Sequence, residues 1–369
     1  MPPKVMATGL VFRNPHPHIR ALHAWHPSLI ALGDYRWLCS FDLGQAVADH
    51  GYGTYLSESV DDGQTWTSPR RLLSVSDPPS SHSLRISRMS DGRIVAFGSL
   101  VDPRLPDQEL INPETFGYAP MKLVTTQSMD DGKTWTDLVA VEPPLEGPAF
   151  ETCHAVVELA DGRWVAPTST WAGWDGNAPS GMKSVLLESR DKGRSWGRAI
   201  TVFDDWTGGV ANLELSLVQM DDGRLIAVAW ALNVSSGETR PTPYALSLDA
   251  HAFTAYGLTG MHAQTAKLTA LGRNRLLCVY RRHDEPGLWT VVVDFDANGW
   301  RNGHPTRLWA GASSGMLGAG SPGDDVNELQ FGYPQCCLRS DGDVELAFWC
   351  RERDANVIRW MRLRIDAGG

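Results

Sequence analysis

The chain has 369 residues and a formal net charge of −10. This acidic balance disfavours nucleic acid or an anionic membrane as a partner, although it leaves room for a local basic pocket. Hydrophobic residues make up 42% of the chain, which is enough for a core, and 15 Trp, 36 Gly and 23 Pro are typical of many short strands joined by tight turns. We therefore expect an all-β protein.

Targeting and metal-binding signals are absent from the sequence. The N-terminal residues contain no apolar run long enough for a signal peptide, and no stretch is long and apolar enough for a membrane span. We expect no membrane partner, and a cytoplasmic location unless a leader has been removed. The six cysteines have neither a disulfide nor a zinc-ligand spacing, so we interpret them as small buried side chains and expect no metal and no cofactor.

Six segments follow one another along the chain with the pattern of a β-hairpin, in which two apolar runs flank a short turn that is Asp-Gly in most copies. They span residues 26–41, 83–97, 153–167, 214–228, 264–279 and 333–348. A further strand is expected after each hairpin, at residues 53–57, 123–127, 184–188, 244–248, 288–293 and 357–364. Units of this kind cannot bury their faces alone, but they can when they are stacked radially.

The last unit ends without room for a fourth strand, so residues 6–13 are predicted to pair with residues 357–364 and close the ring. The resulting fold is a six-bladed β-propeller with four-stranded antiparallel blades, in a single domain that covers residues 1–369. The connections at 101–120 and 309–332 are richer in Pro and Gly, and we expect them to form loops over one face.

A second repeat has the pattern S-x-D-x-G-x-[ST]-W and occurs at 59–66, 128–135 and 189–196. Asp can accept hydrogen bonds from the turn backbone, Gly supplies a positive φ, and Trp packs the next strand. This motif is known as the Asp box, and it makes the chain resemble the sialidase superfamily. That resemblance implies that the boxes join outer blade strands away from the active site. Degenerate copies are expected at 247–253 and 294–300.

The inner strand of each blade lines the central channel of a propeller, so its first residues and the last residues of its partner converge on one face. Imidazoles, guanidinium groups, indoles and an amide gather there, and together they suit the hydroxyl groups and C–H faces of a sugar. We expect a carbohydrate substrate bound by His26, His82, Arg85, His154, Trp171, Trp230, His262, Gln264 and Arg281.

The resemblance to sialidases also implies catalytic residues. Family members carry a Glu and a Tyr eight residues before the turns of the fourth and sixth blades, and Glu214 and Tyr333 occupy these positions. In the family, Glu accepts the phenolic proton and Tyr attacks the anomeric carbon, with retention of configuration. The family's acid/base Asp lies in the loop after the first hairpin, which makes Asp49, or else Asp42, the corresponding candidate.

The chain departs from the family at the arginine clamp that holds the sialic acid carboxylate. His26 follows Trp25 where family members have Arg-Ile-Pro, Trp230 replaces a second arginine, and Trp349 replaces a supporting Glu. Arg281 or Arg282 is a candidate for the third arginine. The expected activity is therefore hydrolysis of a terminal sugar that is either a different sugar or an acidic one held in a new arrangement.

Two other functions fit the same residues. Four blades open with a histidine, and a His/Tyr pair that removes the proton beside a uronate carboxyl would make the protein a polysaccharide lyase. A propeller without the catalytic groups would be a glycan-binding protein. The sequence does not indicate an oligomeric state.

Overall fold

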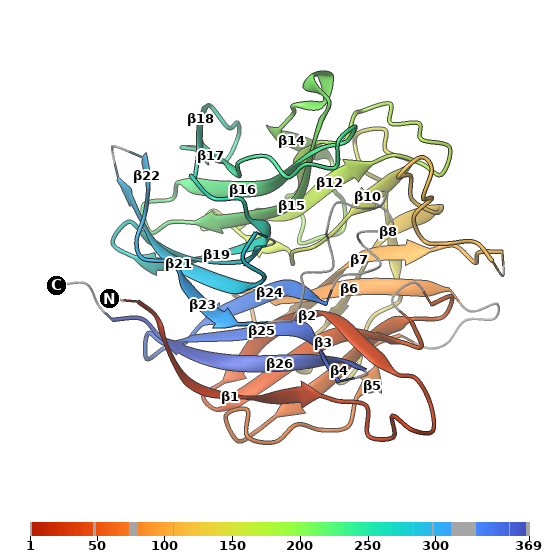
Figure 1. The fold of residues 1–369 in the computed structure, drawn as a ribbon, viewed down its shortest axis with the longest axis vertical. Coiled ribbons are helices and arrows are strands. Elements are labelled where there is room, and N and C mark those ends of the chain that lie inside the picture. Colours follow the sequence, from red (N-terminus) through yellow and green to blue (C-terminus); the bar gives the residue numbers. More distant parts are fainter. Residues whose placement is uncertain are drawn as a thin grey trace.

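Six antiparallel sheets surround a central axis in the computed structural model, which describes residues 2–46, 49–73, 80–105, 107–282, 284–296, 299–310, 330–353 and 355–366 (Figure 1). The sheets follow one another around the ring in chain order, and each has four or five strands. The predicted all-β, six-bladed propeller is confirmed. The last predicted loop, at 309–332, lies largely outside the described residues.

Each blade begins with its inner strand and ends with its outer one. The first contains β2 (His23–Gly33), β3 (Arg36–Gly44), β4 (Gly53–Ser59) and β5 (Arg70–Arg71), and the second β6 (Ser81–Arg88), β7 (Ile94–Val101), β8 (Met121–Ser128) and β9 (Val139–Val141). In the third, β10 (Ala149–Glu151) and β11 (Val157–Glu158) both pair with β12 (Trp164–Trp171), followed by β13 (Ser184–Ser189) and β14 (Arg198–Phe203).

The remaining blades repeat this plan. The fourth contains β15 (Val210–Gln219), β16 (Leu225–Asn233), β17 (Pro243–Ser247) and β18 (Ala255–Leu258), and the fifth β19 (Gln264–Gly272), β20 (Arg275–Arg282), β21 (Gly287–Asp296), β22 (Gly299–Asn302) and β23 (Thr306–Trp309). The sixth contains β24 (Phe331–Leu338), β25 (Val344–Glu352), β26 (Ala355–Arg364) and the N-terminal strand β1 (Lys4–Phe12).

The ring is closed by pairing β1 with β26, which lie side by side in Figure 1. Strand β1 runs antiparallel to β26, with Lys4 opposite Arg364 and Phe12 opposite Ile358. The prediction that the N-terminal run supplies the missing fourth strand is therefore confirmed. This pairing covers the backbone edge that β26 would otherwise expose.

The hydrophobic core lies between neighbouring blades. One cluster joins Phe12 of blade six to Trp25 and Phe41 of blade one, and comparable clusters occupy other blade interfaces. Both faces of a blade are therefore covered by neighbouring blades. This explains why β16 is apolar almost without interruption from Leu225 to Leu232, and does not alternate between apolar and polar residues.

The three S-x-D-x-G-x-[ST]-W turns share one hydrogen-bond pattern. In the first turn, the Ser59 hydroxyl accepts the N–H of Gly63 at 2.9 Å, and the Asp61 carboxylate accepts the N–H of Thr65 at 2.8 Å. The turns at 128–135 and 189–196 repeat both bonds. At 247–253, Asp249 accepts the N–H of His251 at 2.8 Å, whereas the copy at 294–300 lies partly outside the described residues.

The long connection between β7 and β8 lies against blade three. The side chains of Asn112 and Thr115 both donate to the carbonyl of Trp174, and Tyr118 forms a parallel bridge to Gly173. This segment therefore forms one wall above the channel.

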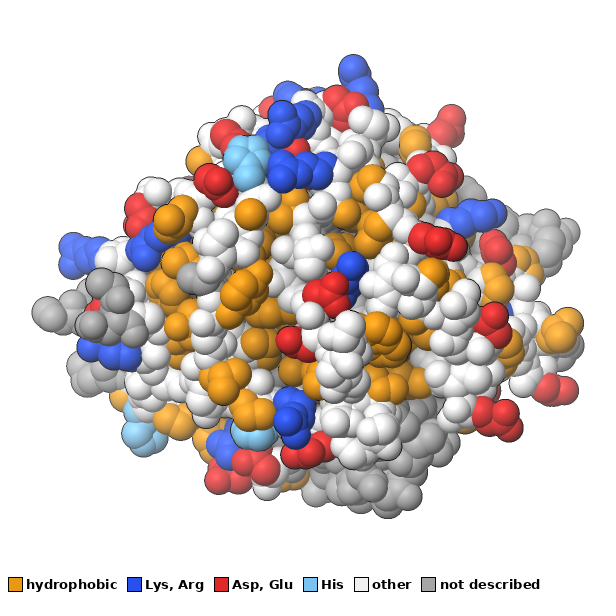
Figure 2. Space-filling model, turned by 90° about the horizontal axis from the view of Figure 1, so that it is seen from above, with side chains coloured by type: hydrophobic (Ala, Val, Ile, Leu, Met, Phe, Trp, Pro, Cys, Tyr) orange, Lys and Arg blue, Asp and Glu red, His pale blue; other side chains and the backbone are white. Residues whose placement is uncertain are grey.

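On the side of the molecule in Figure 2, acidic and basic side chains are interspersed among hydrophobic ones. No helix of the described residues has the length and apolar character needed to cross a membrane.

Candidate active site

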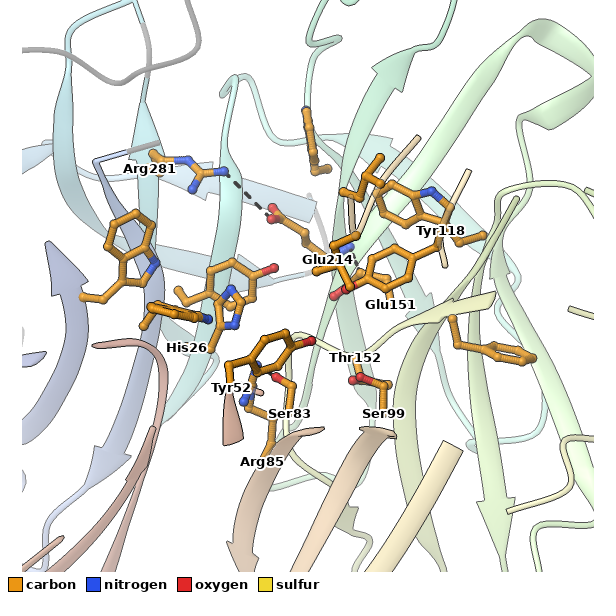
Figure 3. A pocket seen from close by; sticks show the side chains of 18 residues that line it. His26, Tyr52, Ser83, Arg85, Ser99, Tyr118, Glu151, Thr152, Glu214 and Arg281 are labelled. Atoms are coloured by element: carbon orange, nitrogen blue, oxygen red, sulfur yellow. Dashed lines mark hydrogen bonds and ion pairs between the residues drawn. The ribbon is translucent and has the colours of Figure 1, made fainter. Parts of the chain in front are cut away.

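A pocket opens at the channel mouth, where the ends of the inner strands converge, and encloses about 1090 Å³ free of protein atoms, including the part open to solvent. Residues of all six blades contribute to it, as the channel geometry predicts. Its walls are lined by Trp25, His26, Tyr52, Ser83, Arg85, Ser99, Leu110, Ile111, Tyr118, Phe150, Glu151, Thr152, Trp171, Glu214, Trp230, Arg281, Tyr333 and Trp349. Figure 3 shows these side chains.

Backbone bulges aim several of these side chains into the pocket. His26, Glu214, Thr265 and Tyr333 have φ angles of 51°, 56°, 47° and 50°. In each of the four inner strands the pairing register shifts at this position. A single residue with positive φ turns the strand and re-aims its side chain, and such conformations are concentrated at functional sites.

The carboxylate of Glu214 is held by charged and neutral donors. The Thr265 N–H donates to Oε2, the Thr265 hydroxyl lies 3.0 Å from Oε1, and Nη2 of Arg281 lies 3.9 Å from the same oxygen. Burial raises the pKa of Glu214 above its ordinary value, and the charge of Arg281 and the two Thr265 bonds offset only part of this rise. These contacts therefore make the ionised form less unfavourable than it would be for a buried carboxyl group without partners.

Glu151 lies beside Glu214 on the floor of the pocket (Figure 3). Its Oε2 accepts the backbone N–H of Glu214 at 2.8 Å, while its Oε1 is buried and has no hydrogen-bond partner at normal distance within the described residues. The Cys153 thiol also interacts with the Glu151 carboxyl group. Burial and the charge of Glu214 raise the pKa of Glu151 to about 7. Glu151 is therefore about half protonated near pH 7 and mostly protonated below it, which suits a general acid.

Tyr333 projects into the same pocket, but its environment disfavours the phenolate. Burial, Cys153 and the charges of Glu214 and Glu151 raise the pKa of Tyr333 well above its ordinary value, and its hydroxyl interacts with the Cys153 thiol. Tyr333 and Glu214 are thus brought together as the sequence predicts, although Glu214 directs its carboxylate to Thr265 and Arg281.

His26 is oriented by a buried acid. Its Nδ1 lies 3.1 Å from Oδ2 of Asp42, which also accepts the Ser83 hydroxyl at 2.6 Å and lies 3.4 Å from Nη1 of Arg85. Burial lowers the pKa of His26 to about 4, so its ring is neutral and donates Nδ1–H to the carboxylate. The ring centroid is 4.2 Å from that of Tyr333.

Aromatic side chains form the upper walls. The indoles of Trp171 and Trp230 donate to the Phe116 carbonyl and the Thr239 hydroxyl, which fixes the planes of their rings. Tyr52 and Tyr118 face each other across the pocket and interact through their hydroxyl groups. Because Tyr118 belongs to the segment between β7 and β8, that segment narrows the pocket around one end of a ligand.

The structure brings together five of the nine predicted binding residues, namely His26, Arg85, Trp171, Trp230 and Arg281, as lining of the pocket. Gln264 lies behind them and accepts from Arg281 at 3.0 Å. His82 and His154 are buried outside the lining, and His262 is exposed in a separate hollow beside β20. No cluster of three or more metal-ligating side chains occurs in the part of the chain that the structure describes.

Asp49, the predicted acid/base residue, does not line the pocket. Its carboxylate accepts the N–H of Gln45 at 2.8 Å and that of Gly51 at 3.4 Å, so it stabilises its own loop. Asp42 is fully buried beneath His26 and Arg85. Glu151 lines the pocket whereas neither Asp does, and the assignment of the acid/base residue stays a prediction.

Three residues that line the pocket were not predicted from the sequence, namely Glu151, Tyr52 and Tyr118. The hairpin pattern places the start of the third blade at Cys153, but β10 places Glu151 opposite Ser169, two residues earlier. The sequence does contain one sign of this position, because Glu151 is an acidic residue just before a predicted inner strand, where side chains of the other blades reach the channel mouth. Tyr52 and Tyr118 belong to loops, whose position follows from tertiary packing and not from any local pattern.

This chain is similar to known proteins in its structure and not in its sequence. No protein-family model and no curated protein matches the sequence. A Dyadobacter fermentans protein of unknown function matches with a TM-score of 0.74 at 18% identity, covering 99% of both chains. A NanB sialidase mutant from Streptococcus pneumoniae matches with a TM-score of 0.66 at 11% identity, covering 96% of this chain and 70% of that one. The fold is sialidase-like.

An α-L-arabinanase from Penicillium chrysogenum, complexed with arabinobiose, has the same architecture. It matches with a TM-score of 0.67 at 15% identity and covers 97% of this chain and 98% of that one. The structural neighbours of the sialidase-like propeller therefore include enzymes that cleave different sugars, and at these identities the likeness concerns the fold alone.

Proposed function

We propose that the protein is a retaining glycoside hydrolase that removes a terminal sugar. The observation that carries the proposal is the pair of adjacent glutamates, Glu151 and Glu214, on the floor of an aromatic-lined pocket. Their surroundings differ, because Glu214 faces Arg281 and Thr265 whereas Oε1 of Glu151 has no partner within the described residues. Most glycosidases use two carboxyl groups, one as a general acid and the other as a nucleophile or base. The sialidase and arabinanase neighbours support this reaction class.

In the proposed reaction, protonated Glu151 donates its proton to the departing glycosidic oxygen as the Glu214 carboxylate attacks the anomeric carbon. A glycosyl ester on Glu214 results. Water then attacks the same carbon, Glu151 takes up the proton of that water, and release of the sugar restores both groups. The bond from the Glu214 backbone N–H to the Glu151 carboxyl makes the two residues neighbours. Retention of configuration follows from the proposed ester, because its hydrolysis is a second displacement at the same carbon.

Tyr333 as the nucleophile, with Glu214 as its base, stays a prediction. The geometry favours Glu214 itself, because the Tyr333 hydroxyl interacts with Cys153 and both nearby carboxyl groups oppose its ionisation. We assign Tyr333 to sugar contact and to holding the His26 ring.

The test is a panel of nitrophenyl glycosides and oligosaccharides assayed with wild-type protein and its variants. Glu214→Gln and Glu151→Gln should each lower kcat by about 10³-fold or more, whereas Glu146→Gln, an exposed acid outside the pocket, should leave kcat unchanged. Tyr333→Phe should lower kcat far less. A fluorinated glycoside should label Glu214, as read by mass spectrometry of peptides.

Other results would replace this proposal. If Tyr333 carried the label and Tyr333→Phe lost activity, the phenol would be the nucleophile. An inverted product by NMR would exclude a glycosyl ester altogether, and an unsaturated, ultraviolet-absorbing product would show elimination by a lyase. Binding of sugars without any turnover would point to a glycan-binding propeller.

A further inference from the structure

Both arginines that line the pocket are already neutralised by protein groups. Arg85 is 2% exposed, lies 3.4 Å from Asp42 through Nη1, and donates to the Ser83 hydroxyl at 2.8 Å through Nη2. Its Nη1 also donates to the carbonyl of Leu84. A guanidinium buried in this way has its charge balanced before any ligand arrives.

Arg281 is committed in the same manner. It is 1% exposed, and its Nε and Nη2 donate to the Gln264 side-chain oxygen at 3.1 and 3.0 Å. Nη1 donates to the carbonyl of Phe331, and Nη2 lies 3.9 Å from Glu214. Because these bonds tie the planar group to strands β19 and β24, it cannot turn to clamp a ligand carboxylate without breaking them.

The acids in and beneath the pocket already balance these two cations. Glu214 faces Arg281 and Asp42 lies below Arg85, and Glu151 adds a further carboxyl group that is partly ionised near pH 7. A sugar with its own carboxylate would therefore add a negative charge to a place that holds no surplus of positive charge within the described residues. Burying an unpaired charge beside like charges is strongly unfavourable.

The polar atoms that remain without partners suit hydroxyl groups. Oε1 of Glu151, Nε1 of Trp349 and Nε of Arg85 are buried atoms of pocket-lining residues with no hydrogen-bond partner in the described chain. The first can accept from a hydroxyl group, and the other two can each donate to one. Unsatisfied polar atoms are rare in folded proteins and are explained when a ligand completes them.

Four indoles complete the surroundings of the ligand. Trp25, Trp171, Trp230 and Trp349 come from different blades, and all of them line the pocket. Their faces can cover the C–H surface of a sugar ring, which requires no charge on the ligand.

We propose that the pocket takes a neutral terminal sugar and discriminates against sialic and uronic acids. The proposal rests on the function proposed above, and it names the substrate class of the same site. It also accounts for the nucleophile, because a neutral sugar does not repel a carboxylate such as that of Glu214.

The experiment compares glycosides that differ only at C6, which carries a hydroxymethyl group in the neutral sugar and a carboxylate in the acid. Glucosides and galactosides of both anomeric forms are paired with the corresponding glucuronides and galacturonides, and with the methyl esters of these acids as controls that keep the size and remove the charge. A sialoside is added. Hydrolysis is followed by release of the leaving group, and binding of the free sugars to the wild-type protein by titration calorimetry.

At least one neutral sugar should exceed its acid by about 100-fold in binding or kcat/KM, with the methyl ester close to the neutral sugar. If any acidic sugar were bound or hydrolysed as well as its neutral counterpart, the inference would be overturned while the proposed hydrolysis would stand. If the methyl ester were bound and hydrolysed as poorly as the acid, the pocket would exclude both by size, and the charge argument would be overturned. Binding of neutral sugars without hydrolysis would support the inference and remove the proposed function, and no binding at all would remove both.

A variant tests the charge argument directly. Asp42→Asn leaves Arg85 without its carboxylate, so the preference for neutral over acidic sugars should fall by about 10-fold or more. Circular dichroism checks that the variant is folded, and if it is not, the wild-type panel still decides the question. An unchanged preference in a folded variant would contradict the proposed charge balance.

Discussion

Three side chains aimed into the pocket, His26, Glu214 and Tyr333, share a positive φ angle with Thr265, which holds Glu214. A left-handed conformation costs a non-glycine residue about 1–2 kcal/mol, and of these four only His26 belongs to the residue types that are enriched in it. Other non-glycine residues with positive φ lie in turns or loops, but at these four positions an inner strand bends at the pocket, and packing of the neighbouring blades supports the strain.

Glu151 makes the stability of the protein depend on pH. Its pKa is raised from an ordinary value near 4.5 to about 7, so the folded state binds a proton more tightly than the unfolded state does. The free energy of unfolding should therefore fall as pH rises from about 4.5 to about 7. Glu151→Gln cannot ionise, and its stability relative to the wild type should increase over this interval by roughly 1–3 kcal/mol.

Urea denaturation at several pH values measures this difference. Glu146→Gln is the control, since this exposed acid should show no comparable change. A constant difference between Glu151→Gln and the wild type across the interval would mean that Glu151 is not protonated in the folded protein at neutral pH.

At the scale of the element, the turn glycines serve two different purposes. Gly162, in the hairpin turn of blade three, has a φ of +84° and open space around the position of a Cβ atom. Gly132, in the second S-x-D-x-G-x-[ST]-W turn, has a φ of +79°, and a Cβ atom would lie 2.9 Å from Cδ2 of the fully buried Leu38 of blade one. The first glycine serves the local turn, and the second also serves contact between blades.

We expect Gly162→Ala to cost about 1 kcal/mol through backbone strain alone. Gly132→Ala should cost roughly 2–4 kcal/mol, because it adds a clash with a packed leucine to a similar strain. Denaturation curves of the two variants give the comparison. Equal losses would show that this turn does not contribute to contact between blades one and two.

At the scale of the whole molecule, β1 closes the ring. Phe12 is buried near the end of β1, with its ring 5.5 Å from that of Phe41 in blade one, whereas Met6 of the same strand is exposed. Phe12→Ala should lower the free energy of unfolding by about 3–5 kcal/mol, while Met6→Ala should change it by less than about 0.5 kcal/mol. Thermal and chemical unfolding of both variants test this, and a loss confined to Met6→Ala would contradict closure through Phe12.

The architecture could be predicted because its signals are local and repeated. Each Asp-Gly turn between apolar runs specifies a hairpin, six such units at similar spacing require radial stacking, and the unpaired last unit calls for residues near the N-terminus. Glu214 and Tyr333 could be placed in one pocket for the same reason, since their distance from the turn is also a local quantity.

The chemistry of the pocket was decided by contacts between blades. Asp49 and His262 lie near the predicted rim in the sequence, but one is bonded to its own loop and the other is exposed in a separate hollow. The two pocket arginines, Arg85 and Arg281, are present in the sequence, yet only packing shows that protein groups already neutralise them. By itself, the amino-acid sequence determined the propeller and the inner strands, because hairpins and apolar runs act over a few residues. Only the tertiary structure decided that Glu151 lies beside Glu214 and that the described part of the pocket has no spare cation, because burial and charge balance depend on residues far apart in the chain.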